Sequence, residues 1–231
     1  MNRIGNDCKE KIIKLLGIYT DESISWKKPI DHVNSKMSRT LHSISQAKHL
    51  FPCSSLNSLY YAIIHPHISH GLLAWGNALP SLFRKIEILQ KIAIRTINKK
   101  KTYNTPTDPL FRSSRILKLK NLYEYQVNIF MYDVFHKLLP KSFDLVIKYN
   151  HEIQTRPSRQ SHLLHVDRCR TKFVENLPLN VFPKISNKYI KYVTDTETRP
   201  RFKKQIQDYL IKAYPNIVKC TNTHCKDCRQ K

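Results

Sequence analysis

Glycine is scarce in this chain, and that scarcity limits the folds open to it. Only Gly5, Gly17, Gly71 and Gly76 occur among 231 residues. β-Sandwiches and β-barrels reverse direction through many tight turns, and tight turns draw heavily on glycine because it tolerates positive φ. Hydrophobic residues make up 41% of the chain, which is enough to build a core. The sequence therefore predicts a mainly α-helical fold with few hairpins.

The chain is strongly basic. Forty Lys and Arg residues stand against seventeen Asp and Glu, which gives a formal net charge of +23. Self-repulsion of this size is costly without a counter-charge, so we expect a polyanionic partner, and nucleic acid fits best. A lysine-rich surface without a partner is the plain alternative. Anionic lipid is another, but it usually requires a basic amphipathic helix or a lipid anchor, and neither is clear in this sequence.

Nothing in the sequence predicts a membrane or secretory segment. No window approaches 18 consecutive apolar residues, and residues 1–7 contain no apolar stretch of the signal-peptide kind. We therefore expect an intracellular protein with no membrane partner. In that setting its six cysteines are expected to be thiols or metal ligands rather than disulfides.

Apolar residues recur every three or four positions over several segments, a spacing that puts them on one face of a helix. This periodicity predicts helices over the following ranges: about 30–47, 56–63, 82–97, 119–134 and 202–213. The second is expected to carry Leu56, Leu59, Tyr60 and Ile63 on its apolar face, and Pro66 is expected to interrupt it. Residues 11–19 form a short apolar run that suits a strand at a hairpin edge. Beyond Tyr149 the pattern loosens, and we expect residues 150–231 to be loosely structured apart from the terminal helix.

Four segments follow one another along the chain: LGIYTDESISW (16–26), LYYAIIHPHISHGLLAWGN (59–77), LQKIAIRTI (89–97) and TDPLF (107–111). Together they resemble the C-terminal part of the reverse transcriptase of a non-LTR retrotransposon of the jockey-like kind. The resemblance implies a helical thumb-like bundle with a short N-terminal β-hairpin edge. It divides the chain into a palm-edge and primer-grip remnant (1–29), a helical thumb-like domain (30–149), and a basic C-terminal region with a terminal helix and a Cys-rich tail (150–231).

The resemblance also implies a function, that of a C-terminal fragment of an RNA-directed DNA polymerase. Its part would be to bind the RNA template and DNA primer through their phosphate backbones, within a ribonucleoprotein of the nucleus or cytoplasm. The family's pair of adjacent catalytic aspartates is absent, because no two aspartates are adjacent in this sequence. Such carboxylates hold the catalytic metal ions. Mg²⁺ therefore belongs to the parent enzyme and its palm domain, a partner that is missing here.

Within this chain we expect no catalytic residue, no bound cofactor and no small-molecule substrate. Whether it counts as an enzyme stays open. The alternative is a stand-alone or domesticated, non-enzymatic helical protein that binds nucleic acid. A helical protein–protein module with no role in nucleic-acid binding is a third class.

Basic residues mark the start of the first long helix and recur along the third. Lys and Arg on one helical face would neutralise phosphates without reading bases. The alternative is a solvated helix face. The residues that we expect to contact nucleic acid are Lys27, Lys28, Arg84, Lys85, Lys91, Arg95, Lys99, Lys100 and Lys101.

The resemblance assigns a primer-grip-like role to Leu16, Gly17, Ile18 and Trp26. A contact with the primer backbone needs a close approach, which Gly17 permits. The alternative is that Leu16, Ile18 and Trp26 are core residues. For Trp26 we favour packing against the first helix.

His65, His67 and His70 lie close together around Pro66, which raises the question of a metal site. No Cys or carboxylate lies near them in the sequence, so packing or surface roles are favoured over metal binding.

The C-terminal tail contains Cys220, His224, Cys225 and Cys228. The Cys-x2-Cys pair has the spacing of a zinc site, and Cys220 or His224 would supply further ligands for Zn²⁺. Flexible free thiols are the alternative.

Overall fold

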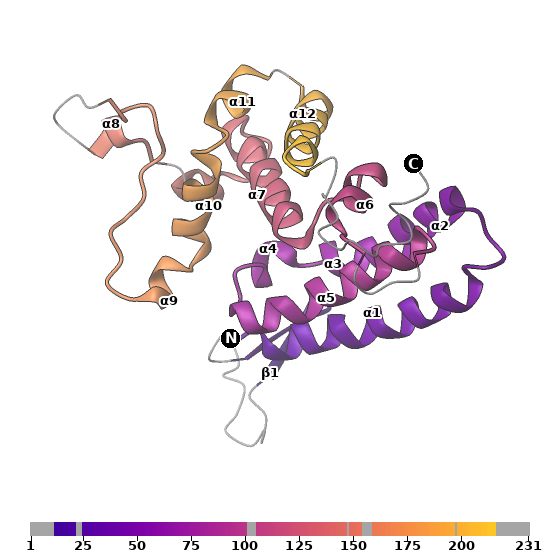
Figure 1. The fold of residues 1–231 in the computed structure, drawn as a ribbon. Helices are drawn as coiled ribbons and strands as arrows, with labels where there is room; N and C mark the ends of the chain where they lie inside the picture. Colours follow the sequence, from indigo (N-terminus) through magenta and orange to yellow (C-terminus); the bar gives the residue numbers. More distant parts are fainter. Residues whose placement is uncertain are drawn as a thin grey trace.

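The computed structural model describes residues 12–21, 25–100, 105–146, 148–153, 159–196 and 198–215. These residues form a mainly helical molecule with one two-stranded antiparallel hairpin near the N-terminus, which confirms the predicted fold class (Figure 1). The elements are β1 (Ile12–Leu15), β2 (Ile18–Asp21), α1 (Lys27–Ala47), α2 (Cys53–Leu59), the π-helix η1 (Tyr60–Ile64), α3 (His65–Ser69), α4 (Leu72–Trp75), α5 (Pro80–Ile97), α6 (Asp108–Ser113), α7 (Leu119–Phe135), the 3₁₀-helix η2 (Lys141–Val146), α8 (Asn150–Ile153), α9 (Lys172–Glu175), α10 (Pro178–Ser186), α11 (Ile190–Asp195) and α12 (Arg199–Lys212).

The hairpin turns within two residues, because Leu15 pairs with Ile18 across the Leu16–Gly17 loop. Both loop residues have positive φ, 48° at Leu16 and 84° at Gly17. Two-residue hairpin loops of this kind match the right-handed twist of the flanking strands. Gly17 adopts the conformation without strain, whereas Leu16 carries a Cβ in a region that bulky residues rarely occupy.

The long helices α1 and α5 pack along each other and run in the same direction (Figure 1). An ion pair of 3.2 Å between Lys85 and Asp31 joins the two helices near their starts. The apolar face of α1 buries Ile30, Met37, Leu41 and Ile44, as the periodicity predicted.

The helix after α1 continues past Pro66 instead of stopping there. Proline lacks an N–H and its ring would clash with the carbonyl four residues earlier, so a regular α-helix is not sustained at this point. The chain instead widens into the π-helix η1, in which the backbone N–H of His65 donates to the carbonyl of Tyr60. The wider turn shifts the buried face by one residue. Ile64 is therefore fully buried while Ile63, expected on the apolar face, is 38% exposed.

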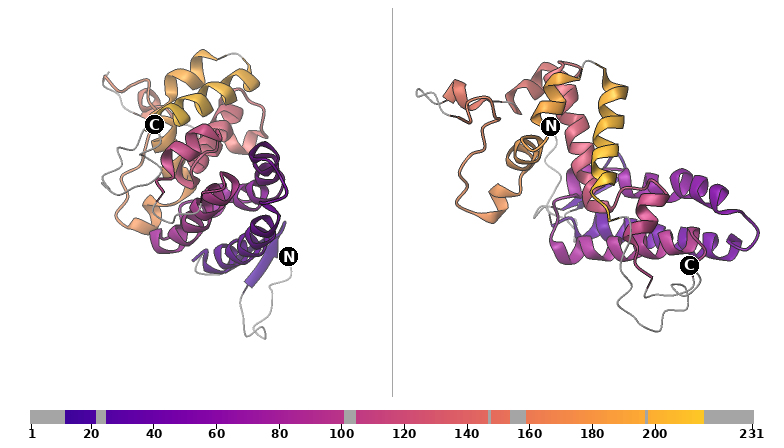
Figure 2. Two further views of the ribbon diagram at one scale, coloured as in Figure 1. Left: turned by 45° about the vertical axis from the view of Figure 1, so that its right-hand side comes forward. Right: turned by 45° about the horizontal axis from the view of Figure 1, so that its top comes forward.

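Beyond residue 100 the helices gather around α7, which packs against α10, α11 and α12 (Figure 2). The predicted terminal helix is confirmed as α12, whose apolar face buries Phe202, Ile206 and Leu210. Tyr132 of α7 stacks on Phe202 with 4.6 Å between ring centroids. The segment from Arg159 to Thr171 contains no helix.

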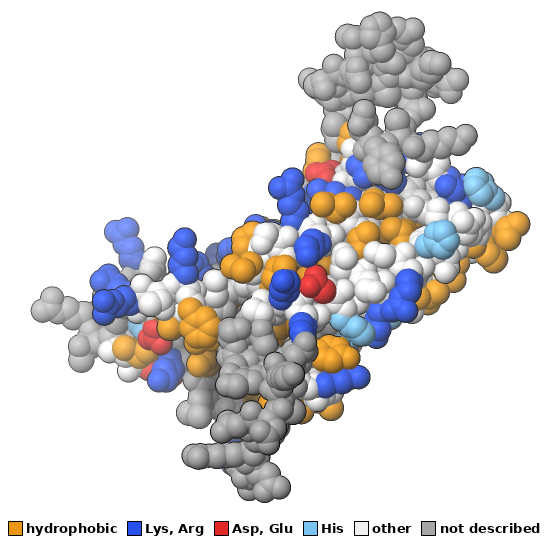
Figure 3. All heavy atoms as spheres, turned by 90° about the horizontal axis from the view of Figure 1, so that it is seen from below, with side chains coloured by type: hydrophobic (Ala, Val, Ile, Leu, Met, Phe, Trp, Pro, Cys, Tyr) orange, Lys and Arg blue, Asp and Glu red, His pale blue; other side chains and the backbone are white. Residues whose placement is uncertain are grey.

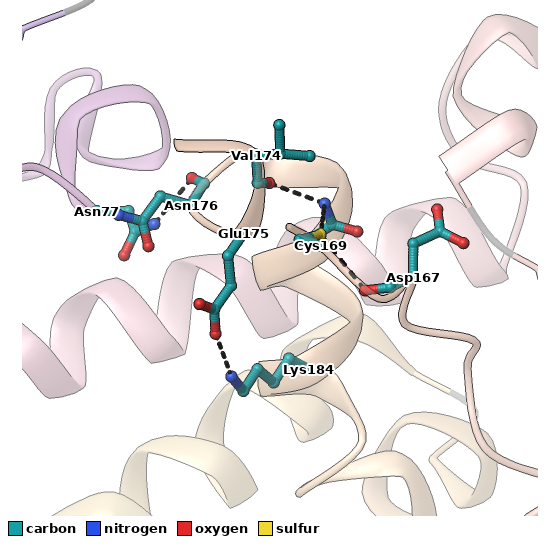
Figure 4. Close-up of polar contacts among 8 residues, drawn as sticks. Asn77, Asp167, Cys169, Val174, Glu175, Asn176 and Lys184 are labelled. Atoms are coloured by element: carbon teal, nitrogen blue, oxygen red, sulfur yellow. Dashed lines mark hydrogen bonds and ion pairs between the residues drawn. The ribbon is translucent and has the colours of Figure 1, made fainter. Parts of the chain in front are cut away.

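Short polar contacts fix α9 and α10 (Figure 4). Asn180 Nδ2 donates to the carbonyl of Val174 at 2.8 Å, and Lys184 pairs with Glu175 at 3.1 Å. Asn77, which follows α4, donates to the carbonyl of Asn176 at 2.8 Å and so ties α9 to the first part of the chain.

The predicted division into 1–29, 30–149 and 150–231 stays a prediction. Its first boundary falls inside α1, and α7, which ends before the second, packs against helices beyond it. Nearly all buried hydrophobic residues of the described ranges belong to one cluster that extends from Ile30 to Tyr214.

Candidate nucleic-acid interface

The helices from α1 to α5 carry a large excess of positive side chains. Between residues 27 and 100 the only acidic residues are Asp31 and Glu87. The basic residues of the same stretch are Lys27, Lys28, Lys36, Arg39, Lys48, Arg84, Lys85, Lys91, Arg95, Lys99 and Lys100. Figure 3 looks onto the face that carries α1, and Lys and Arg side chains are spread along it with few acidic side chains between them.

The predicted basic face of α5 is real but partial. At about 100° per residue, Arg84, Lys91 and Arg95 fall within about 40° of one another around the helix. Arg84 and Lys91 are exposed and form no ion pair with a described acidic side chain. Arg95 is half-buried, and its Nε donates to the carbonyl of Thr105 at 3.1 Å. Lys85 lies about 100° further round and pairs with Asp31.

The remaining predicted contacts lie at the two ends of the α1–α5 pair. Lys27 and Lys28 begin α1, at the same end as the start of α5, whereas Lys99 and Lys100 follow the end of α5 and are exposed. An 18-residue helix is about 27 Å long. That length matches roughly eight steps of 3.4 Å along a nucleic-acid strand. Lys101 lies outside the described residues.

The primer-grip-like residues do not share one surface. Leu16 projects at the hairpin tip and is 87% exposed. The close approach that Gly17 permits is taken up within the chain: His70 Nε2 donates to the carbonyl of Leu16 at 3.2 Å, and a Cβ at Gly17 would lie 3.3 Å from the same nitrogen. Ile18 packs over Gly71, where a Cβ would come within 2.5 Å of its Cδ1.

Trp26 is partly buried against the hydrophobic core and precedes α1 with a φ of 58°. This position agrees with the interpretation that it packs against the first helix. Its backbone carbonyl accepts a hydrogen bond of 3.2 Å from the N–H of Ile30.

A pocket of about 310 Å³ lies where the hairpin meets α1 and α3. It brings two of the primer-grip-like residues together with helix residues far away in the sequence. Its walls are formed by Gly17, Ile18, Tyr19, Pro29, His32, Val33, Lys36, Pro66, His67, His70 and Trp75.

The pocket has a positive electrostatic environment. Burial lowers the pKa of His32, and the charges of Lys36, Lys14 and Arg39 lower it further. Burial and Lys36 likewise lower the pKa of His67. A lowered histidine pKa means that added positive charge is disfavoured at that place.

Sequence reasoning did not single out His32 or Lys36 as site residues. They are four residues apart on α1, a spacing that puts them on the same helical face, and Arg39 follows three residues later. That stripe of basic side chains opposite the buried face was visible in the sequence. The proximity of this stripe to His67 could not be seen in the sequence, because α1 and α3 are brought together only by folding.

No group of three or more His, Cys, Asp or Glu side chains in the described part of the chain is arranged to hold a metal ion. Among the three histidines around Pro66, His70 anchors the hairpin and His67 lines the pocket. The candidate zinc ligands Cys220, His224, Cys225 and Cys228 lie outside the described residues.

None of the helices in the described ranges is both long and apolar enough to cross a bilayer. Comparison with known proteins gives no relative: no family model, no curated protein and no solved structure matches this chain.

Proposed function

We propose that this chain binds the sugar-phosphate backbone of nucleic acid through its N-terminal helices, as the template–primer-holding part of a retrotransposon reverse transcriptase. The observation that carries the proposal is the charge of residues 27–100, where eleven Lys and Arg residues, named above, stand against Asp31 and Glu87. Backbone binding requires just such an excess of positive charge, without base-reading groups.

The reverse-transcriptase part of the proposal rests on the four sequence segments and their order. Without an adjacent aspartate pair, this chain would hold nucleic acid while a palm domain supplied the carboxylates and Mg²⁺. The place of action would be a ribonucleoprotein in the nucleus or cytoplasm.

Salt dependence of binding tests the backbone contact. A fluorescent RNA–DNA hybrid would be titrated with the chain at 50, 100 and 200 mM NaCl. If about six phosphates are contacted, affinity should fall roughly a thousandfold over this range. Binding that ignores salt, or no binding at all, would instead favour the protein–protein module.

Two further observations test the fragment hypothesis, and the second of them separates it from a stand-alone binder. A primed RNA template with Mg²⁺ and dNTPs should yield no DNA extension when the chain is present alone; extension would overturn the claim that the polymerase carboxylates lie elsewhere. An upstream reading frame that encodes an Asp-Asp palm would support the fragment. A promoter and start codon of its own would support the stand-alone binder.

A further inference from the structure

The pocket between the hairpin, α1 and α3 has positive or titratable basic groups on its walls. Lys36, His32, His67 and His70 line it, and among the described residues no Asp or Glu side chain does. Asp31, next to His32 in the sequence, is engaged by Lys85 of α5 at 3.2 Å. The pocket is therefore complementary to an anion.

The side chains that surround His32 come from three elements and are mostly basic. From the hairpin come Lys14 and Tyr19, with the Tyr19 ring edge-on to the imidazole at 5.3 Å between centroids. Lys14 Nζ lies 5.4 Å from the centroid of that Tyr19 ring. From α1 come Lys36 and Arg39, with Lys28 one turn before His32, and from α3 comes His67. Among these groups the phenol of Tyr19 and the imidazole of His67, whose pKa is lowered, are the partners without charge at neutral pH.

One histidine of the pocket, His70, already forms a hydrogen bond within the chain. His70 donates from Nε2 to the carbonyl of Leu16 and holds the hairpin tip against the α3–α4 turn. His32 and His67 make no hydrogen bond to a described residue through their ring nitrogens, and so they remain available with Lys36 to face a ligand.

The volume of the pocket and its apolar walls limit the kind of ligand that it can hold. A volume of about 310 Å³ is at the lower end of the range for small-ligand pockets. Ile18, Val33 and Trp75 supply apolar wall. A phosphate group with part of its attached sugar suits such a space, with the oxygens towards Lys36 and the carbon atoms towards the apolar side.

We propose that this pocket binds a phosphate group of a nucleic-acid strand through Lys36, His32 and His67, and that protonation of the two histidines strengthens the binding. The inference rests on the proposed function and adds a defined subsite and a pH dependence to it. A phosphodiester keeps its single negative charge across the range in which histidine titrates, so any gain in affinity at lower pH comes from the protein.

The pH dependence follows from linkage. In the protein alone, burial and positive neighbours both oppose protonation of the two imidazoles. A bound phosphate reverses that local balance and favours the protonated rings. If phosphate promotes protonation, protonation must promote phosphate binding by the same factor.

The test is a binding titration with a fluorescein-labelled single-stranded 12-mer carrying no terminal phosphate, at 100 mM NaCl and at pH 8.0 and 6.0. Wild-type affinity should rise about tenfold at pH 6.0. The double variant His32→Gln with His67→Gln should bind more weakly than the wild type at both pH values and should lose the gain at pH 6.0. The matched control is His42→Gln with His49→Gln, two exposed histidines at the other end of α1 and just beyond it, which should keep the gain.

Lys36→Gln should weaken binding about fivefold at both pH values, the cost of one phosphate contact to a single strand at 0.1 M salt, and Lys36→Arg should restore most of it. An undiminished pH gain in the His32→Gln, His67→Gln variant overturns the proposal. The proposal is also overturned if the His42→Gln, His49→Gln control loses the gain at pH 6.0 to the same extent as the His32→Gln, His67→Gln variant.

Two further arms identify the source of the phosphate. If a 5′-phosphate on the 12-mer tightens binding in the wild type but not in Lys36→Gln, the pocket takes a strand end; equal binding with and without it assigns an internal phosphodiester. Histidine ring NMR in inorganic phosphate, against chloride at equal ionic strength, should show raised pKa values for His32 and His67, and unchanged values overturn the proposal. If these pKa values rise but neither the wild-type chain nor any variant binds the 12-mer, the pocket takes free phosphate only. Both the proposed function and this inference then fail.

Discussion

The helices before residue 100 and those after it use charge in opposite ways. Beyond residue 100, acidic residues join separate segments through ion pairs: Arg115–Asp208, Lys118–Asp108, Lys184–Glu175, Lys188–Glu124 and Arg199–Asp133. In α1–α5, Lys85–Asp31 is the single ion pair in which both partners are described.

This difference shows which positive charge is available to a partner. In the second region five Lys and Arg residues are paired in this way and link segments of the fold, whereas other exposed cations, such as Arg201 and Lys204, form no ion pair with a described acidic side chain. In the first region apolar packing holds α1 against α5, and most of the cations remain exposed to solvent. The face of α1 and α5 therefore presents positive charge with few acidic side chains among it (Figure 3).

The largest expected effect lies at the junction of the two regions. Buried Gln90 of α5 donates from Nε2 to Tyr60 Oη at 3.0 Å and to the carbonyl of Leu117 at 2.9 Å, and it accepts from the N–H of Leu119 at 2.8 Å. Gln90→Leu leaves these groups unpaired in the core, so the free energy of unfolding should fall by about 4 kcal/mol. Urea denaturation measures it. The exposed control Gln46→Leu should change stability by less than about 0.5 kcal/mol, and equal losses in the two variants would refute the role of Gln90.

Removal of charge from each region tests the comparison directly. Arg84→Gln with Lys91→Gln on α5 should weaken binding to an RNA–DNA hybrid about 60-fold at 100 mM salt and reduce the salt slope by about 2, since two phosphate contacts are lost. The matched variant Arg201→Gln with Lys204→Gln removes the same charge from exposed positions of α12 and should change affinity much less. Equal losses would mean that the whole surface, and not the α1–α5 face, attracts the nucleic acid.

Ion pairs from the two regions should differ in their contribution to stability. Arg199 donates from Nε and from one terminal nitrogen to both carboxylate oxygens of Asp133, each at 2.6 Å, and the Asp133 side chain is only 12% exposed. Arg199 itself is 44% exposed, so solvent screens part of the interaction. Arg199→Ala should therefore lower the free energy of unfolding by about 2 kcal/mol. Lys85→Ala breaks a pair that is exposed on both sides and should cost less than about 0.5 kcal/mol. Thermal unfolding at pH 7 would show the contrast, and similar losses would contradict it.

The smallest expected effect is an acid sensitivity of the first region. Burial lowers the pKa values of His32, His65 and His67 below the ordinary 6.5. Near and below pH 6.5 the unfolded chain thus binds more protons than the folded one, so stability falls as the pH falls through that range. Urea denaturation at pH 7.5 and pH 5.5 would measure the loss. His65→Gln should reduce it and the exposed His42→Gln should not; a loss that neither variant alters would locate the sensitivity elsewhere.

Much of the fold could be predicted because helix formation leaves a local trace. The spacing of Ile30, Met37 and Leu41 marks α1, and the run before Gly17 marks the hairpin. The same reasoning placed Ile63 on the buried face, which is wrong. The π-helix before Pro66 adds a residue to the turn, and a fixed period of 3.6 cannot anticipate that.

The candidate site was predicted less completely. Exposed Arg84 and Lys91 agree with the expected basic face, whereas Lys85 and Arg95 are engaged within the chain. The pocket was not anticipated, since His32 and His67 are 35 residues apart and neither has a distinguishing motif.

The sequence alone determined the sign of the charge, the helical class and the position of most helices, because composition and periodicity are properties of single segments. The tertiary structure decided which cations keep their charge exposed and which are paired, and it created the basic pocket under the hairpin. Those features depend on distances between segments, and only the packing of the apolar faces against one another sets such distances.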